Sequence, residues 1–182
     1  PHKSLVPFGS RKIIDHLMSE IIAAGGKHIT IVGSDDNAKK SFQECFKHEK
    51  IVENKFKKLN NQIGLELLQS IYIPENVNIR YVIQKEPKGV AHAIGLAAQK
   101  INNRHLAIIL PDDIIITSDG ISIVKKVVEK YISDGSKGNL FLTRKVNDIS
   151  RWGIVDNGKL IEKPKTCNSK EAAIMLFIID KM

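Results

Sequence analysis

Two adjacent carboxylates, Asp112 and Asp113, follow the apolar run His105–Leu110 (HLAIIL) after a single proline. No lysine or arginine occurs between residues 105 and 124. Mg²⁺ is typically bound by one or two protein carboxylates, and phosphate oxygens complete its coordination shell. The pair is therefore a candidate site for a divalent cation that also holds a phosphate. The alternative is a helix cap or an ordinary loop.

A second candidate is the charged pair Glu162 and Lys163, at the end of the short segment Lys159–Glu162. Lys163 would bind a phosphate as a point charge, and Glu162 would accept a hydrogen bond from a ligand hydroxyl. The alternative is a solvated ion pair on the surface, which contributes little to stability.

A third group follows the apolar segment Asn78–Ile83 (NIRYVI). Gln84 carries an amide donor and an amide acceptor, which suit the edge of a pyrimidine base. Gly89 begins a predicted helix, whose first backbone amides would face a ligand. In isolation, an exposed glutamine and an ordinary turn glycine explain these two residues as well. His92, in the first turns of that helix, is expected to be a packed histidine rather than a catalytic base.

Predicted strands and helices alternate along the chain, and they position these candidates. The predicted strands cover residues 28–32, 78–83, 105–110, 139–143, 153–155, 159–162 and 172–179, and the predicted helices cover 10–24, 38–70 in two or three pieces, 89–101 and 121–132. This order predicts an α/β fold with a mostly parallel sheet covered by helices. Ligands of such sheets bind at the carboxyl ends of the strands, where all three candidate groups fall.

Composition narrows the class of protein. The chain has 182 residues, which favours one domain, and 28 basic against 20 acidic residues give a net charge of +8. That excess suits an anionic partner, either nucleic acid or a small phosphorylated ligand. The lysine-rich segment Phe46–Leu59 has helical spacing, so a solvated amphipathic helix is favoured over a nucleic-acid contact.

The two cysteines, Cys45 and Cys167, are too few for a disulfide framework and indicate reduced thiols in a cytoplasmic protein. No apolar run is long enough for a membrane span.

Taken in order, these segments resemble the bacterial UTP–glucose-1-phosphate uridylyltransferases of the sugar nucleotidyltransferase family. The segments that carry the resemblance are KSLVP (3–7), ITIVGSDDNA (29–38), ELLQSI (66–71), GVAHA (89–93), LPDD (110–113), RWGIVD (151–156) and EKPK (162–165). The lysine-rich helices from Phe42 to Gln69 are similar to an insertion of the bacterial uridylyl enzymes, which favours UTP over dTTP. The resemblance implies a Rossmann-like three-layer α/β/α fold.

The resemblance also implies a role for each candidate residue. Lys3 would contact phosphates, Gln84 and Gly89 would bind the uracil, Asp112 would bind Mg²⁺, Gly153 and Glu162 would hold the glucose, and Lys163 would bind its phosphate. The implied catalytic residues are therefore Lys3, Asp112 and Lys163. The implied partners are UTP and glucose-1-phosphate, with no nucleic acid or membrane, in a cytoplasmic homo-oligomer (a dimer or tetramer).

The chain departs from the family pattern at several positions. The family's GxGTR phosphate loop is expected upstream of Lys3, and a second metal-binding aspartate beyond Met182, so residues 1–182 look like one domain that lacks both ends. Ser4 replaces a usual glutamate, and Glu171 and Leu176 fall where the family has an asparagine and a glycine. Two alternatives therefore stay open: a catalytically impaired nucleotide-binding relative, or a nucleotidyltransferase for another sugar phosphate. A basic nucleic-acid-binding domain is a third hypothesis, but no recognition helix or zinc motif supports it.

Overall fold

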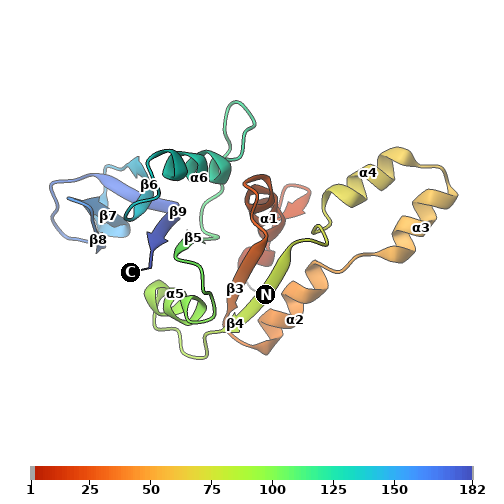
Figure 1. Cartoon of the computed structure of the whole chain (residues 1–182), viewed down its shortest axis with the longest axis horizontal. Helices are drawn as coiled ribbons and strands as arrows, with labels where there is room; N and C mark the ends of the chain where they lie inside the picture. Colours follow the sequence, from red (N-terminus) through yellow and green to blue (C-terminus); the bar gives the residue numbers. More distant parts are fainter. Residues whose placement is uncertain (1–2, 182) are drawn as a thin grey trace. The chain divides into compact units, whose positions relative to one another are not determined.

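The computed structural model describes residues 3–181, which form two compact units with their boundary in the chain between Lys100 and Ile101 (Figure 1). Unit 1 contains the 3₁₀ helix η1 (Lys3–Leu5), β1 (Pro7–Phe8), β2 (Arg11–Lys12), α1 (Ile13–Ala23), β3 (His28–Gly33), α2 (Asp36–Cys45), α3 (Lys50–Lys58), α4 (Gln62–Ser70), β4 (Asn78–Ile83) and α5 (Val90–Ala98). Unit 2 contains β5 (His105–Ile109), α6 (Ile123–Ser133), β6 (Leu140–Lys145), the 3₁₀ helix η2 (Ile149–Arg151), β7 (Gly153–Asp156), β8 (Lys159–Glu162) and β9 (Glu171–Asp180). Within residues 3–181, no helix has the length and apolar character needed to cross a membrane. The predicted mixed α/β fold is confirmed.

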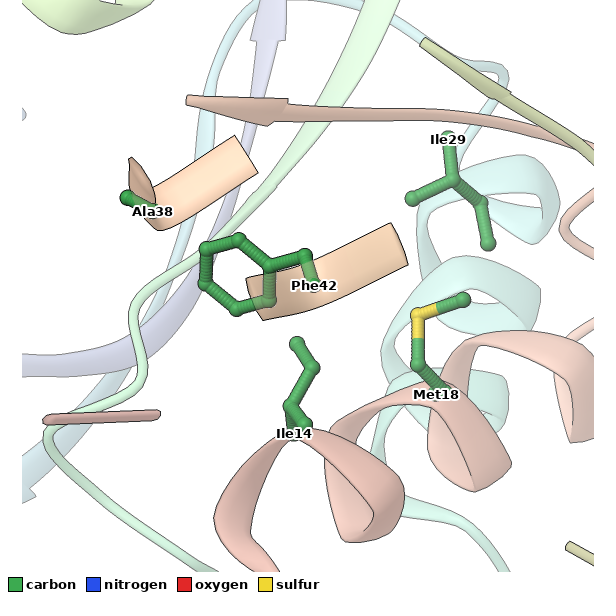
Figure 2. Close-up of a cluster of buried hydrophobic side chains, with 5 residues drawn as sticks. All are labelled: Ile14, Met18, Ile29, Ala38 and Phe42. Carbon is green, nitrogen blue, oxygen red and sulfur yellow. The ribbon is translucent and has the colours of Figure 1, made fainter. Parts of the chain in front are cut away.

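Unit 1 is built around the parallel pair β3 and β4, which align over their whole length. The helices α1 and α2 each present apolar residues one turn apart to the same side, because positions i and i+4 share a helix face. Together with Ile29 of β3, these residues form the buried cluster shown in Figure 2: Ile14, Met18, Ile29, Ala38 and Phe42. Phe42 is only 1% exposed, so its ring lies at the centre of this core.

The chain between β3 and β4 makes a helical excursion through α2, α3 and α4 (Figure 1). The helix α2 begins at a side-chain cap, where Asp35 Oδ1 accepts a hydrogen bond from Ala38 N at 2.8 Å. The predicted division of residues 38–70 into two or three helical pieces is confirmed, with a break at Asn60 and Asn61, where Asn61 caps α4 by accepting from Gly64 N at 2.8 Å. Neither α3 nor α4 contains a buried residue, as expected for solvated amphipathic helices.

Unit 2 is built on a five-stranded sheet in which β9 is the central strand. One edge of β9 pairs with β6, and the other edge pairs with β5 and, further along, with β7. The strand β8 pairs with β7 as a hairpin. All the described pairs of this sheet are antiparallel.

The prediction of a mostly parallel sheet is therefore wrong for unit 2, and only the β3–β4 pair of unit 1 follows it. The strands β5 and β6 run in the same direction and are joined through α6, as the alternating pattern predicts. However, β9 occupies the position between them, since both pair with it at Phe177. The chain reaches β9 through the β7–β8 hairpin and not through a helix, so β9 runs in the opposite direction.

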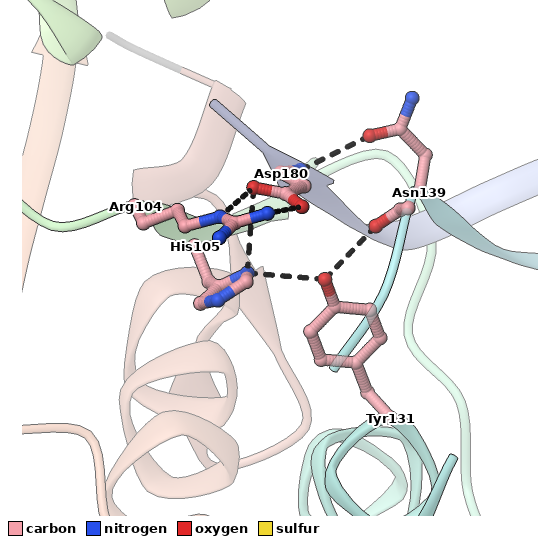
Figure 3. Close-up of polar contacts among 6 residues, drawn as sticks. Arg104, His105, Tyr131, Asn139 and Asp180 are labelled. Atoms are coloured by element: carbon pink, nitrogen blue, oxygen red, sulfur yellow. Dashed lines mark hydrogen bonds and ion pairs between the residues drawn. The ribbon is translucent and has the colours of Figure 1, made fainter. Parts of the chain in front are cut away.

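A polar network ties the end of β9 to the start of β5 and to α6 (Figure 3). The guanidinium of Arg104 donates two hydrogen bonds to the carboxylate of Asp180, at 2.6 and 2.8 Å. His105 Nδ1 lies 3.1 Å from Tyr131 Oη and 3.9 Å from Asp180 Oδ1. Asp180 N donates to Asn139 Oδ1 at 3.0 Å. These contacts fix the point at which the last strand enters the sheet.

Candidate functional site

Gln84 and Gly89, the predicted base-binding pair, are in direct contact in unit 1. Gln84 directly follows β4, and its backbone N–H donates to Gly33 O at 2.8 Å, which extends the β3–β4 ladder by one residue. Gln84 Nε2 lies 3.1 Å from Gly89 O and 3.0 Å from His92 Nδ1. The three residues thus form one hydrogen-bonded group between the end of a strand and the first turn of α5.

The backbone conformation of Gly89 explains why a glycine stands at the start of α5. Its φ is 86°, in the left-handed region that side chains with a Cβ rarely adopt. A Cβ at this position would meet no atom within 4 Å, so the requirement comes from the backbone and not from a neighbour. The space beside Gly89 is therefore open for a ligand.

Gly153 and Glu162, the predicted sugar-binding pair, face each other in the β7–β8 ladder of unit 2. The hairpin turn is formed by Asn157 and Gly158, whose φ values of 49° and 73° are those that a type I′ turn requires. A Cβ on Gly153 would lie 3.1 Å from Leu160 Cδ1 and 3.5 Å from Glu162 Oε2. The ladder therefore places the Glu162 carboxylate over a position that has no side chain.

Lys163, the predicted phosphate ligand, follows β8 directly and has an unusual backbone conformation. Its φ is 44°, although it is not a glycine. Its backbone N–H donates to Trp152 O at 3.0 Å, which holds the residue against the start of β7. Lys163 Nζ lies 3.6 Å from Glu162 Oε1, and both side chains are exposed. This pair contributes little to stability, and the ammonium is accessible to a ligand.

Asp112, the predicted metal ligand, is an exposed residue that follows β5. The register places Ile109, the end of β5, opposite Leu176 of β9, and places Ile154 of β7 opposite Ala172 on the same edge. At roughly 3.3 Å per residue, these positions are about 13 Å apart along β9. The loop that carries Asp112 therefore begins along the same edge of β9 as the strand that holds Gly153, about 13 Å further along. Residues 3–181 contain no group of three or more His, Cys, Asp or Glu side chains suited to a metal ion.

Lys3 lies in η1 of unit 1, with its side chain exposed. The structure thus brings Gln84 and Gly89 together, and it brings Gly153, Glu162 and Lys163 together in the other unit. The meeting of both groups with Lys3 and Asp112 in one site stays a prediction.

Three positions at which the sequence departs from the family pattern have structural roles of their own. Ser4 lies in η1 of unit 1 and is buried, with 3% of its surface exposed. Glu171 Oε2 accepts a hydrogen bond from Thr143 Oγ1 at 2.9 Å, between β9 and β6. Leu176 is fully buried in the sheet of unit 2. These side chains therefore contribute to folding, whatever they do for a ligand.

Sequence reasoning missed a hollow of about 570 Å³ in unit 2, at the end of β6. Its charged and aromatic lining residues are Arg144, Lys145, Asp148, Arg151 and Trp152. The Arg144 guanidinium stacks 4.3 Å from the centre of the Trp152 ring. These residues leave an excess of positive charge around the hollow. The signal in the sequence was weak, because the three cations are spread over eight positions, at the end of β6 and in η2.

The comparisons with known proteins place the chain in a family. Residues 1–181 match the family profile described as nucleotidyl transferase, so the chain belongs to the nucleotidyl transferase family. Among curated proteins, it is 31% identical over 176 residues to UTP–glucose-1-phosphate uridylyltransferase 1 of Staphylococcus saprophyticus subsp. saprophyticus, a match that covers 90% of this chain and 58% of the relative. The chain thus spans little more than half the length of this relative.

Solved structures of UDP-glucose pyrophosphorylases have the same fold. The apo form of one such enzyme matches with a TM-score of 0.82 and 25% identity, covering 98% of this chain and 68% of that one. A UDP-glucose pyrophosphorylase complexed with UDP-glucose matches with a TM-score of 0.74 and 25% identity, covering 98% of this chain and 67% of that one. Both matches extend over the two units of the chain.

Proposed function

We propose that the chain acts in the transfer of a uridylyl group, joining UTP and glucose-1-phosphate into UDP-glucose and pyrophosphate. The observation that carries this proposal is its 31% identity to a UTP–glucose-1-phosphate uridylyltransferase over 176 residues. The contact between Gln84 and Gly89 supports it, because this pair is suited to the edge of a pyrimidine base. The three-layer arrangement of the fold, the cytoplasmic location and the homo-oligomeric state stay predictions.

In this mechanism, an oxygen of the sugar phosphate attacks the α-phosphorus of UTP in line, and pyrophosphate leaves. All the reacting groups are anionic, so the protein must mainly position them and neutralise their charge. Lys3 would contact the phosphates of UTP, and Lys163 would hold the phosphate of the sugar. No side chain has to form a covalent bond with the substrate.

The sugar would lie against the β7–β8 ladder. Because Gly153 has no side chain, the Glu162 carboxylate can lie over its backbone, and from there it would accept hydrogen bonds from the hydroxyls of a sugar bound at this hairpin. Lys163 follows directly, so a phosphate on the same sugar would meet its ammonium. The order of the three residues thus matches a phosphorylated sugar from ring to phosphate.

The chemistry of the donors available at the end of β5 fits a magnesium ion. Mg²⁺ needs few protein ligands when substrate phosphates supply the others, so one or two carboxylates suffice. Asp112 would hold the ion, and Asp113 is its immediate neighbour. When bound, the ion would offset the negative charge that repels the two substrates from each other.

The proposal is tested on protein from the complete gene by measuring pyrophosphate release from UTP and glucose-1-phosphate with Mg²⁺. We expect turnover, and we expect Asp112→Ala to lower it by more than about 100-fold while the melting temperature is kept. The control is Asp134→Ala, which removes an exposed carboxylate paired with Lys130. Unchanged turnover in Asp112→Ala would reject the metal assignment.

The same assay separates the alternatives. A wild-type protein that binds UTP but releases no pyrophosphate with any sugar phosphate would overturn the enzymatic proposal in favour of an impaired relative. Turnover with another sugar phosphate, but not with glucose-1-phosphate, would overturn the choice of substrate. It would support the interpretation that Glu171 and Leu176, which differ from the family pattern, change the specificity for the sugar.

A further inference from the structure

The hollow of about 570 Å³ at the end of β6 is surrounded by more positive than negative charge. Its lining contains the cations Arg144, Lys145 and Arg151 and a single carboxylate, that of Asp148. Lys145 stands opposite Glu171 in the β6–β9 ladder, so the charge that is not offset nearby belongs to the two arginines. Both arginines are exposed, and within residues 3–181 neither guanidinium forms an ion pair or donates a hydrogen bond. Their N–H donors are therefore available to a ligand.

The carboxylate of Asp148 is directed to its own loop. Asp148 Oδ1 accepts hydrogen bonds from Ser150 N at 3.0 Å and from Ser150 Oγ at 2.6 Å. Two residues further on, Trp152 N donates to Ile149 O at 3.2 Å. These bonds hold the loop that lines the hollow before any ligand binds, which reduces the entropy that binding would cost.

Trp152 restrains the side chain of Arg144. The guanidinium lies 4.3 Å from the centre of the Trp152 ring, where the two groups attract each other. Stacking occupies the flat face of a guanidinium and leaves the N–H groups along its edge, in the geometry that forms two parallel hydrogen bonds to a phosphate. A phosphate group carries about two negative charges at neutral pH, so the pair of arginines matches its charge.

The Trp152 ring lies on the other face of the β7–β8 hairpin from the Gly153–Glu162 pair. Trp152 has extended backbone angles (φ −124°, ψ 154°), and its carbonyl accepts from Lys163 N, so it continues β7 by one residue. Successive side chains of a strand point to opposite faces. A ligand against Trp152 is thus separated from the face on which Glu162 lies over Gly153.

We propose that the hollow is a second anion site, which binds the phosphate group of a small ligand through the guanidiniums of Arg144 and Arg151. The shared chemistry is that of a phosphate dianion, supplied either by inorganic phosphate or by a nucleotide. This site goes beyond the proposed function and does not depend on it, because none of the residues assigned to UTP, magnesium or the sugar lines the hollow.

The fluorescence of Trp152 tests the proposal directly, because Trp152 is the only tryptophan among the 182 residues. Protein from the complete gene is titrated with inorganic phosphate and, at matched ionic strength, with chloride, and the emission that remains in Trp152→Phe is subtracted. We expect a saturable change with phosphate and none with chloride. Equal responses to the two salts would show screening of charge without binding and would overturn the site.

Charge-removing variants assign the binding to the two arginines. We expect Arg144→Gln and Arg151→Gln each to weaken phosphate binding by about tenfold or more, judged from the midpoint of the titration and not from its amplitude. The matched control is Lys137→Gln, which removes an exposed positive charge of the same unit outside the hollow and should change the midpoint by less than about threefold. Similar losses in all three variants would overturn the assignment. Because these side chains are exposed, we expect each variant to keep the melting temperature of the wild type.

Two further titrations decide whether the site is separate and what it binds. Lys163→Gln should keep the phosphate midpoint, and a loss as large as that of Arg151→Gln would overturn the separation from the substrate position. Adenosine monophosphate is the second probe, since its base is not a pyrimidine. Binding about tenfold tighter than that of inorganic phosphate would support a nucleotide as the ligand, whereas equal binding would support recognition of the phosphate group alone. Absence of turnover in the pyrophosphate assay would leave all of these results unaffected.

Discussion

Gly153 and Glu162 oppose each other across the β7–β8 ladder so closely that a Cβ added to the glycine would lie 3.5 Å from Glu162 Oε2. The same Cβ would lie 3.1 Å from Leu160 Cδ1, which is tighter than ordinary packing. The glycine thus lets the side chains of Leu160 and Glu162 occupy the space over its backbone. Replacing it tests whether that space serves the hairpin or a ligand.

We expect Gly153→Ala to change stability little and to weaken the binding of glucose-1-phosphate clearly. Leu160 is 46% exposed, so its side chain can move away, and the loss should stay below the roughly 1–3 kcal/mol of an overfilled core. The added methyl group would occupy the space next to Glu162, and we expect KM for glucose-1-phosphate to rise by about tenfold or more.

The matched control is Gly95→Ala, in α5, where a new Cβ meets no atom within 4 Å. It should leave that KM unchanged. Equal KM values in the two variants would show that the space beside Gly153 does not receive the sugar.

The ion pair between Arg104 and Asp180 should make the stability of unit 2 depend on acid pH. Hydrogen bonds from the Arg104 guanidinium lower the pKa of Asp180 below its ordinary value. A carboxyl whose pKa is lowered on folding stabilises the fold above its unfolded pKa, about 3.9, and loses that contribution as pH falls through the folded pKa.

We therefore compare the melting temperatures of wild type and Arg104→Gln between pH 7 and pH 3. The variant should melt at a lower temperature at neutral pH, and the difference should begin to shrink as the pH falls below about 4 and should shrink further as the pH approaches the lowered pKa of Asp180 in the folded wild type. The carboxyls elsewhere titrate equally in the two proteins and cancel in the difference. A difference that stays constant over this range would count against the ion pair as its cause.

The core of unit 1 should depend strongly on Phe42, whose side chain is 1% exposed among Ile14, Met18 and Ala38. Phe42→Ala removes a buried ring and leaves a cavity, and we expect it to lower the free energy of unfolding by about 3–5 kcal/mol. Leu59→Ala, at a residue 64% exposed, should change it by less than about 0.5 kcal/mol. Urea denaturation measures both, and similar losses in the two variants would contradict the packing described here.

Cys45 should react slowly with thiol reagents at neutral pH. Partial burial raises the pKa of its thiol, and the hydrogen bond from Lys12 Nζ, 3.3 Å from Cys45 Sγ, only partly opposes this. In a Cys167→Ser background, the rate of reaction with iodoacetamide should reach half its maximum at a pH above about 8.5, which is the ordinary pKa of a free cysteine thiol.

Lys12→Met tests the opposing contact, because it removes a donor that favours the thiolate. The variant should need a still higher pH for the same rate. A half-maximal rate below about pH 8.5 in the Cys167→Ser protein would contradict the raised pKa of Cys45.

Much of the element order could be predicted from the sequence, because the apolar patterns of the strands and helices are strong. The segments His28–Gly33 and Asn78–Ile83 are strands as expected, and the break at Asn60 follows from two turn-forming residues. The direction of pairing in unit 2 could not be predicted. Glu171–Asp180 pairs with β5 and β6 over at least 25 intervening residues, and no local pattern specifies such a partner.

The candidate site was predictable to a similar degree. The pairing of Gly153 with Glu162 follows from a hairpin with an Asn–Gly turn, which is a local signal. The contact of His92 with Gln84 was missed, because a histidine inside an apolar helix is ordinarily a packed residue and only coordinates reveal which atom its Nδ1 faces.

The central position of β9 has a consequence for biosynthesis. During translation, β5 and β6 are made long before the strand that must pair with both, so each leaves the ribosome with a bare backbone edge. These edges stay open to pairing with other chains until about residue 180 has emerged. The sheet of unit 2 therefore forms late in synthesis, because it depends on pairing between residues that are far apart in the sequence. We infer that the chain depends most on chaperones during that interval.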